Sequence, residues 1–135
     1  MKKKIDISTL MYVAIIVLIY FLGTTIGLTQ EVITASNFDS KIAKDISVVE
    51  FWADWNKQNQ FGDIVKIKEA EKYRVDIMND ASLQSEYNIT GIPTVIIFDN
   101  GVEKERFKPN IMFQLEADKK IIQNSVDTII LNKFQ

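Results

Sequence analysis

The sequence predicts an α/β domain, with a central mixed β-sheet flanked by helices, preceded by one N-terminal transmembrane helix. Short apolar runs rich in β-branched and aromatic residues alternate with segments at helical spacing, which is typical of α/β domains. A long uncharged stretch after three lysines predicts the preceding helix. We therefore divide the chain into residues 1–30, a cytoplasmic stub and anchor, and residues 31–135, the domain.

The anchor is predicted from residues 10–28, which form the apolar part of the uncharged stretch. At a rise of about 1.5 Å per residue, a helix of this length measures roughly 28 Å, close to the ~30 Å hydrocarbon core of a bilayer. Lys2, Lys3 and Lys4 should stay in the cytoplasm, so the single-pass topology places the domain on the extracytoplasmic side, the periplasm in a Gram-negative cell. A cleaved signal peptide is the alternative, although its apolar region is usually shorter.

The first half of the domain reads as β-α-β. Residues 31–34 predict a short strand. Ser36, followed three residues later by Asp39, has the form of a capping box and predicts a short helix that ends near Lys44. The run 47–52 (SVVEFW) consists largely of β-branched and aromatic residues, which fits a central strand buried on both faces.

A second helix is expected after the central strand, because apolar residues at helical spacing follow Trp55. It should begin at Asn56 or Lys57 and end near Ala70. A further strand is predicted at residues 73–77.

The second half begins with a third helix over residues 81–87, capped by Asp80. Strands at 94–98 and 102–107 should form an antiparallel hairpin, because Asn100-Gly101 tolerates the positive φ of a tight turn. Residues 108–110 are expected to be a loop. A last amphipathic helix presents a buried stripe of Leu115, Ile122, Val126, Ile129 and Ile130.

Two motifs carry a family resemblance. Residues 51–60, FWADWNKQNQ, are similar to the FWAxWCxxC stretch of thioredoxins, with Asn56 and Asn59 at the two cysteine positions. Gly91-Ile92-Pro93-Thr94 resembles the cis-proline loop of the same family. The resemblance covers residues 31–131 and implies a thioredoxin-like fold in which a cis Pro93 lies close to Asn56.

The resemblance also implies a shortened second helix. Compared with typical thioredoxins, the interval from Trp55 to the strand at Tyr73 is about seven residues short, or two helical turns. A shortened helix has two possible consequences. One face of the sheet is left less covered and available to a partner, or the chain repacks locally.

The absence of cysteine decides the expected chemistry. Thiol–disulfide exchange needs a reactive thiolate and a second thiol, and the chain has no cysteine. We therefore expect a redox-inactive protein that is not an enzyme and has no catalytic residue. Insulin reduction by a pure sample would contradict this expectation.

The sites that remain concern binding and structure. Asn56 is either a helix N-cap or, with Asn59, a hydrogen-bonding group for a partner. The resemblance implies that the backbone of Ile92 pairs with an extended peptide. It also places Glu50 and Arg74 where the family keeps a buried carboxylate and its basic partner, so we expect a structural ion pair there. The predicted partner-binding surface comprises Trp55, Asn56, Lys57, Gln58, Asn59, Ile92 and Pro93.

Composition limits the partners. The whole chain carries −2; Lys2, Lys3, Lys4 and Asp6 contribute +2 of this, so residues 7–135 carry −4. An acidic domain with interspersed charges argues against a nucleic-acid partner. Because the chain lacks both histidine and cysteine, the usual zinc ligands are missing and no metal or cofactor is expected.

The resulting hypothesis is a membrane-anchored thioredoxin-like domain that acts as a protein-binding or structural accessory subunit. Its partners would be membrane or extracytoplasmic proteins, or a multi-subunit membrane complex, and the lipid bilayer through residues 10–28. The alternative is a chaperone-like module that binds extended polypeptides at the cis-proline loop.

Overall fold

The computed structural model describes residues 6–22 and 30–135. The N-terminal helix α1 spans Ile7–Leu22. None of the helices within those two ranges has the length and apolar character needed to cross a membrane. The predicted transmembrane helix is therefore not supported by the described residues, and positions 23–28 of its range lie outside them.

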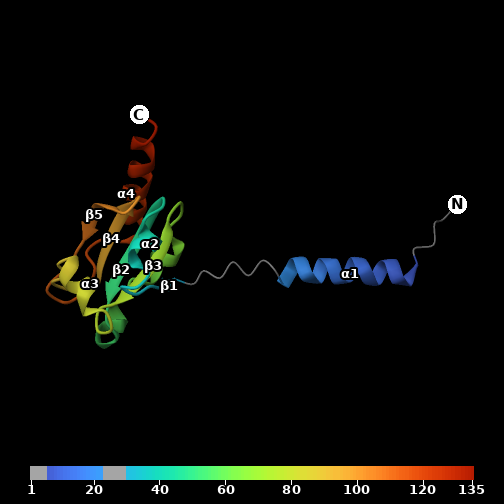
Figure 1. Cartoon of the computed structure of the whole chain (residues 1–135), viewed down its shortest axis with the longest axis horizontal. Coiled ribbons are helices and arrows are strands. Elements are labelled where there is room, and N and C mark those ends of the chain that lie inside the picture. The colour runs from blue at the N-terminus through green and yellow to red at the C-terminus, as the bar shows by residue number, and fades with distance from the viewer. Residues whose placement is uncertain (1–5, 23–29) are drawn as a thin grey trace.

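A five-stranded mixed sheet forms the centre of the domain (Figure 1), as predicted. β1, β3 and β2 run parallel, whereas β4 and β5 are antiparallel to their neighbours. In spatial order the strands are β1 (Glu31–Val32), β3 (Glu71–Asp76), β2 (Ile46–Trp52), β4 (Thr94–Asp99) and β5 (Val102–Phe107).

The central strand β2 separates two hydrophobic cores. Val49 and Phe51 point into the core beneath α2 (Phe38–Ile42) and α3 (Ala81–Glu86). Ile46 and Val48 point into the second core, beneath α4 (Lys119–Asn132). Alternation of side chains along a strand explains this division. As predicted, β2 is buried on both faces.

The second helix is not α-helical, and this prediction was wrong. Two short 3₁₀ helices replace it: η1 (Asp54–Asn59) and η2 (Gly62–Lys66). Gln60 between them is extended, at φ −56° and ψ 138°, so no continuous helix can form. The interval is too short to hold a long helix and still reach β3, and two tight turns cover the distance.

The sheet face beneath η2 is nevertheless covered, so the alternative of an uncovered face is wrong and local repacking is correct. Ile64 and Ile67 are buried in the second core. The segment after η2 is held by Gln123 of α4. Its Oε1 accepts from the Lys68 N–H at 2.8 Å and its Nε2 donates to the Lys68 carbonyl at 3.2 Å. The amide of Gln123 thus bonds the backbone N–H and carbonyl of Lys68, which would have bonded other backbone groups if the segment were helical.

Two predicted caps are also wrong. The capping box at Ser36 does not form: α2 begins one residue later, and the Asn37 Oδ1 accepts from the Thr34 N–H at 2.8 Å. Asp80 precedes α3 without capping it, and its Oδ1 accepts from the Ala35 N–H at 3.2 Å instead. In both places the side-chain oxygen accepts from a loop N–H that lies outside the helix. The local sequence pattern therefore assigned the wrong hydrogen-bond partner to these side chains.

The hairpin between β4 and β5 is confirmed. Asn100 and Gly101 both adopt positive φ, 49° and 81°, as a two-residue turn of this type requires. The last helix is also confirmed, although Leu115 lies before its first residue. Asp118 caps it by accepting from the Ile121 N–H at 2.9 Å.

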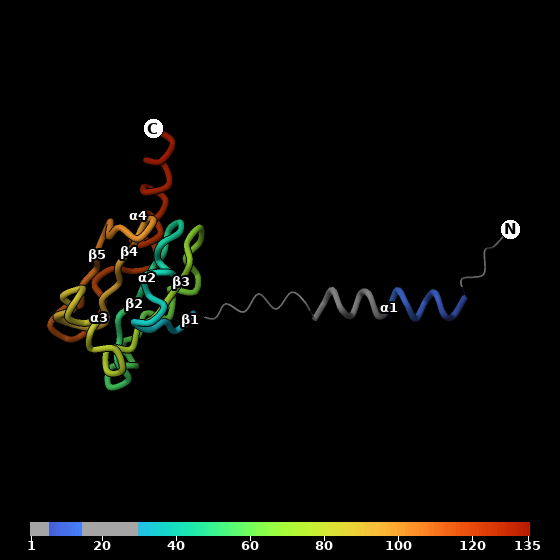
Figure 2. The backbone as a smooth tube through the Cα atoms, viewed as in Figure 1, coloured from blue at the N-terminus to red at the C-terminus, as the bar shows by residue number. Residues whose placement is uncertain are grey.

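The two ends of the domain are distinct in the backbone trace (Figure 2). The C-terminal end of α4 lies at the top of the view, and the green turn that follows β2 lies at the bottom. That turn contains η1, which carries the predicted site residues Trp55 to Asn59.

Candidate functional site

Three segments meet beyond the carboxyl end of β2. They are η1, the loop containing Ile92 and Pro93, and the loop between β5 and α4. The Ile92–Pro93 peptide bond is cis, as the resemblance implied. The structure therefore brings Asn56 and Asn59 together with the cis-proline loop.

Asn56 links all three segments. It is only 4% exposed, and its Nδ2 donates to the carbonyl of Ile92 at 3.2 Å and to that of Phe113 at 3.0 Å. Its Oδ1 accepts from the Nδ2 of Asn59 at 2.8 Å. Both amide hydrogens and the amide oxygen thus bond groups within the domain.

The interpretation of Asn56 as an N-cap is wrong. η1 begins after Ala53, and no side chain caps it. Asn56 lies inside η1 with φ −115° and ψ 25°, outside helical values, which turns its side chain toward the two carbonyls. An inward amide satisfies buried carbonyl groups that would otherwise have no donor.

The predicted surface residues divide into two layers. Trp55, Lys57 and Gln58 are exposed, and Asn59 is half-buried. Ile92 and Pro93 are buried, so a partner at this surface meets the η1 side chains first.

Sequence reasoning missed the loop that completes the site. Residues 110–114 lie against η1, and the ring of Phe113 packs edge-to-face on Trp55, with 5.4 Å between ring centroids and an interplanar angle of 87°. The signal was present in the sequence: Ile111, Met112 and Phe113 form an apolar run inside a segment whose Lys-Pro-Asn start predicted a loop.

Glu50 and Arg74 are ion-paired beneath the site. Glu50 is completely buried, and its Oε2 accepts from the Nη2 and Nε of Arg74 at 2.9 and 3.0 Å. The other carboxylate oxygen accepts from the backbone N–H of Phe61 at 2.6 Å. The guanidinium also lies over the Trp52 ring, 5.0 Å from its centroid. The pair therefore joins β2, β3 and the start of η2, which is a structural role.

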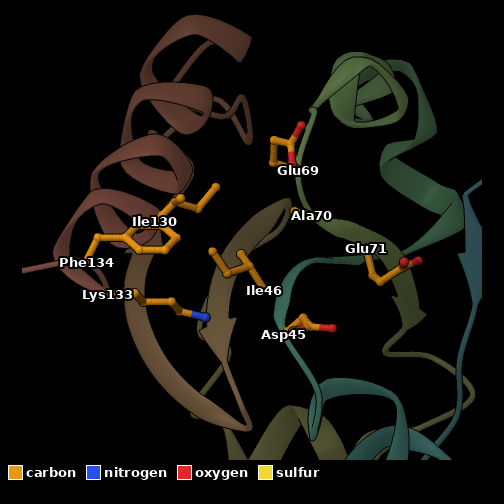
Figure 3. A pocket seen from close by; sticks show the side chains of 8 residues that line it. All are labelled: Asp45, Ile46, Glu69, Ala70, Glu71, Ile130, Lys133 and Phe134. Carbon is orange, nitrogen blue, oxygen red and sulfur yellow. The ribbon is translucent and has the colours of Figure 1, made fainter.

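A hollow of about 540 Å³ lies at the opposite end of the domain, between α4 and the start of β3 (Figure 3). Ile46 and Ile130 contribute apolar side chains, and Glu69 and Glu71 contribute carboxylates. No predicted site residue lines it. Within residues 6–22 and 30–135, no cluster of three or more side chains suited to a metal ion was found.

Comparison with known proteins gives consistent matches. The family model described as Thioredoxin matches residues 29–124. The thioredoxin of Mycoplasma genitalium is 33% identical over 70 residues, covering 47% of this chain and 69% of that protein. The thioredoxin of Staphylococcus epidermidis is 32% identical over 78 residues, covering 51% of this chain and 73% of that protein.

Solved structures agree on the fold. A mutant thioredoxin from Halobacterium salinarum superimposes with a TM-score of 0.63 at 18% identity, over 75% of this chain and 90% of that one. The oxidised thioredoxin of Plasmodium falciparum gives a TM-score of 0.58 at 20% identity, over 75% and 98% of the two chains. At such identities the likeness shows the fold alone.

These relatives correct one prediction. They are named thioredoxin, an oxidoreductase, so the prediction that the chain is not an enzyme is contradicted. The relatives are distant, with about a third of positions identical over half of the chain, and the absence of cysteine supports inactivity only weakly. Because the family model matches most of the domain and the fold agrees with it, the chain belongs to the thioredoxin family.

Proposed function

We propose that this thioredoxin-family domain is a protein-binding or structural accessory subunit of a membrane or envelope complex. In this proposal the N-terminal segment anchors the chain in the bilayer and the domain lies outside the cytoplasm. The partner docks on the surface formed by Trp55, Lys57, Gln58 and Asn59, and binding uses side-chain and backbone contacts.

The observation that carries the proposal is the Asn56 link. One side-chain nitrogen bonds the carbonyls of Ile92 and Phe113, and one oxygen accepts from Asn59. Three loops that are far apart in the sequence are thereby fixed as one surface before any partner arrives. A preorganised surface loses less conformational entropy on binding, and an exposed tryptophan held in place by Phe113 is a typical binding anchor.

Support for the anchor comes from the N-terminal segment. Three lysines precede the uncharged stretch, an order that favours a cytoplasmic N-terminus. The described part of that stretch is helical, and side chains such as Leu10, Met11 and Val13 are exposed. A bilayer would cover these apolar side chains.

A chaperone-like module is the second candidate, and the backbone of Ile92 favours it. Among the described residues its N–H makes no hydrogen bond. Its carbonyl accepts only from Asn56, which leaves a second lone pair. An extended polypeptide would pair with these groups as with a strand edge only after the side chains that cover Ile92, which is 2% exposed, move aside.

The test is a pull-down of the full chain in mild detergent through a C-terminal tag, with mass spectrometry of the bound proteins. A Trp55→Ala, Lys57→Glu variant should lose the partner. The matched control, Val102→Ala with Lys104→Glu, changes an exposed apolar residue and an exposed lysine on β5 and should retain it.

A second measurement separates the two candidates. Permanently unfolded, carboxymethylated α-lactalbumin should bind if the domain is chaperone-like and should not bind if it is a dedicated subunit. A chain that elutes alone as a monomer and ignores the unfolded protein would contradict both.

A further inference from the structure

Four large apolar side chains protrude together at the lower end of the domain. Ile111 is 98% exposed, Met112 67%, Trp55 55% and Phe113 47%. The rings of Trp55 and Phe113 are in contact, and Ile111 and Met112 immediately precede Phe113 in the chain. We call Ile111, Met112 and Phe113 the apolar tip; Trp55 packs at its base and belongs to the docking surface described above.

The tip is held in a defined conformation by Asn110. The Oδ1 of Asn110 accepts from the backbone N–H groups of Met112 and Gln114 at 2.8 and 3.1 Å. Its own N–H donates to the Gln114 carbonyl at 2.8 Å, and its carbonyl accepts from the Phe113 N–H at 3.0 Å. These bonds pair the N–H groups of Met112, Phe113 and Gln114 within the loop, which lowers the cost of moving it into the membrane–water interface.

We propose that the apolar tip inserts into the interfacial region of a lipid bilayer and sets the orientation of the domain on the membrane. The inference rests on the membrane attachment in the proposed function and goes beyond it by assigning a second contact. A protruding loop with a nearly fully exposed isoleucine suits a fluid apolar phase, and aromatic side chains favour the membrane–water interface.

The length of the connecting chain allows this contact. Seven residues lie between Leu22, the last residue of α1, and Gln30; this stretch, part of which belongs to the proposed anchor, spans at most about 28 Å. The chain then joins the sheet at Gln30, whose Nε2 donates to the Tyr73 carbonyl at 2.7 Å.

The point of entry lies about midway along the central strand. Glu31 is in register with Tyr73, and Tyr73 with Val49 of β2. From Val49, the end of β2 at Trp52 is about 10 Å away at ~3.3 Å per residue, and Trp55 follows within η1. A bilayer that holds α1 is therefore within reach of the tip.

The charges around the tip fit an apolar contact. Lys57 and Lys108 are exposed and close in sequence to Trp55 and Ile111, and so is the carboxylate of Asp54; the two lysine side chains can extend to lipid headgroups. Residues 31–135 carry −4, because residues 7–30 are uncharged. Insertion should thus be as strong on zwitterionic as on anionic vesicles.

The absence of cysteine gives a direct test with the full chain. Met112→Cys and Val102→Cys are each labelled with an environment-sensitive fluorophore and mixed with phosphatidylcholine vesicles, with or without brominated acyl chains. Val102 is the matched control, because it is similarly exposed but lies at the opposite end of the sheet, beside the Asn100-Gly101 turn. Vesicle flotation is measured separately.

The label at position 112 should shift to the blue and be quenched by brominated lipid, whereas the label at 102 should not change. Adding Ile111→Ser to the Met112→Cys chain should remove most of the quenching without preventing flotation. Equal signals at both positions, or no quenching at 112 in a chain that floats, would overturn the inference while leaving the anchor intact. A chain that does not float would refute the membrane anchor and the inference together. An Ile111→Ser effect on oligomeric state in detergent, without lipid quenching, would instead identify an interface with protein.

Discussion

Replacing Asn56 with alanine removes the link between η1, the cis-proline loop and the loop before α4. The change deletes two donated hydrogen bonds, to the carbonyls of Ile92 and Phe113, and one accepted from Asn59. The Ile92 carbonyl is buried in this contact, so alanine leaves it without its donor.

The magnitude follows from these contacts. Each lost hydrogen bond contributes about 0.5–1.5 kcal/mol net, and an unsatisfied buried group adds about 1–3 kcal/mol. Because the half-buried Asn59 can turn to water, the two carbonyls dominate, and the free energy of unfolding should fall by roughly 3 kcal/mol. For a domain of this size that corresponds to a melting temperature lower by about 15 °C.

The assay is urea unfolding of the full chain in detergent, followed by tryptophan fluorescence, with Asn59→Ala as the matched control. Asn59 contributes one hydrogen bond at the edge of the site, so its replacement should lower the free energy by no more than about 1 kcal/mol. If the two variants are equally stable, the Asn56 link does not hold the site together and the preorganised surface loses its basis.

Three further predictions concern the framework. Arg74→Leu should destabilise the domain by about 3–5 kcal/mol, because Glu50 remains buried without its partner, and the Glu50→Leu, Arg74→Leu double variant should be less affected; additive effects in a double-mutant cycle would speak against the pair. The hydrogen bond from Arg106 lowers the pKa of Glu103 below 4.5. The stabilisation from this pair should therefore be complete above pH 4.5 and disappear as the pH falls through the lowered pKa of Glu103. The test is the urea midpoint of Glu103→Gln, measured against pH. If the midpoint of this variant falls below pH 4.5 as steeply as that of the wild type, the pair contributes nothing to stability. Gly101→Ala should lower stability by about 1 kcal/mol through its φ of 81° alone, since the new Cβ would meet no atom closer than 3.8 Å; a neutral effect in thermal melts would contradict this.

Local patterns in the sequence predicted most of the fold. The strands were found because β-branched and aromatic runs mark buried strands wherever they occur. The Asn100-Gly101 hairpin was found because positive φ is a property of the two residues themselves. The cis bond before Pro93 followed from the resemblance of the loop to a known family.

The missed second helix shows the limit of periodicity. Phe61 and Ile64 are buried at helical spacing, yet they belong to 3₁₀ turns. The spacing of apolar residues cannot predict this, because it carries no information about how many residues are available to connect β2 to β3. That length is a property of the assembled sheet, and Gln123 of α4 completes the arrangement from the other side of the core.

The sequence by itself determined the family, the sheet and the absence of a thiol at positions 56 and 59. Only the tertiary structure decided what Asn56 does, because its partners lie 36 and 57 residues away in the chain. It likewise decided that Ile111, Met112 and Phe113 stand exposed beside Trp55. Hydrogen bonds and exposure between distant segments depend on how the loops pack at one end of the sheet, and no local pattern records that packing.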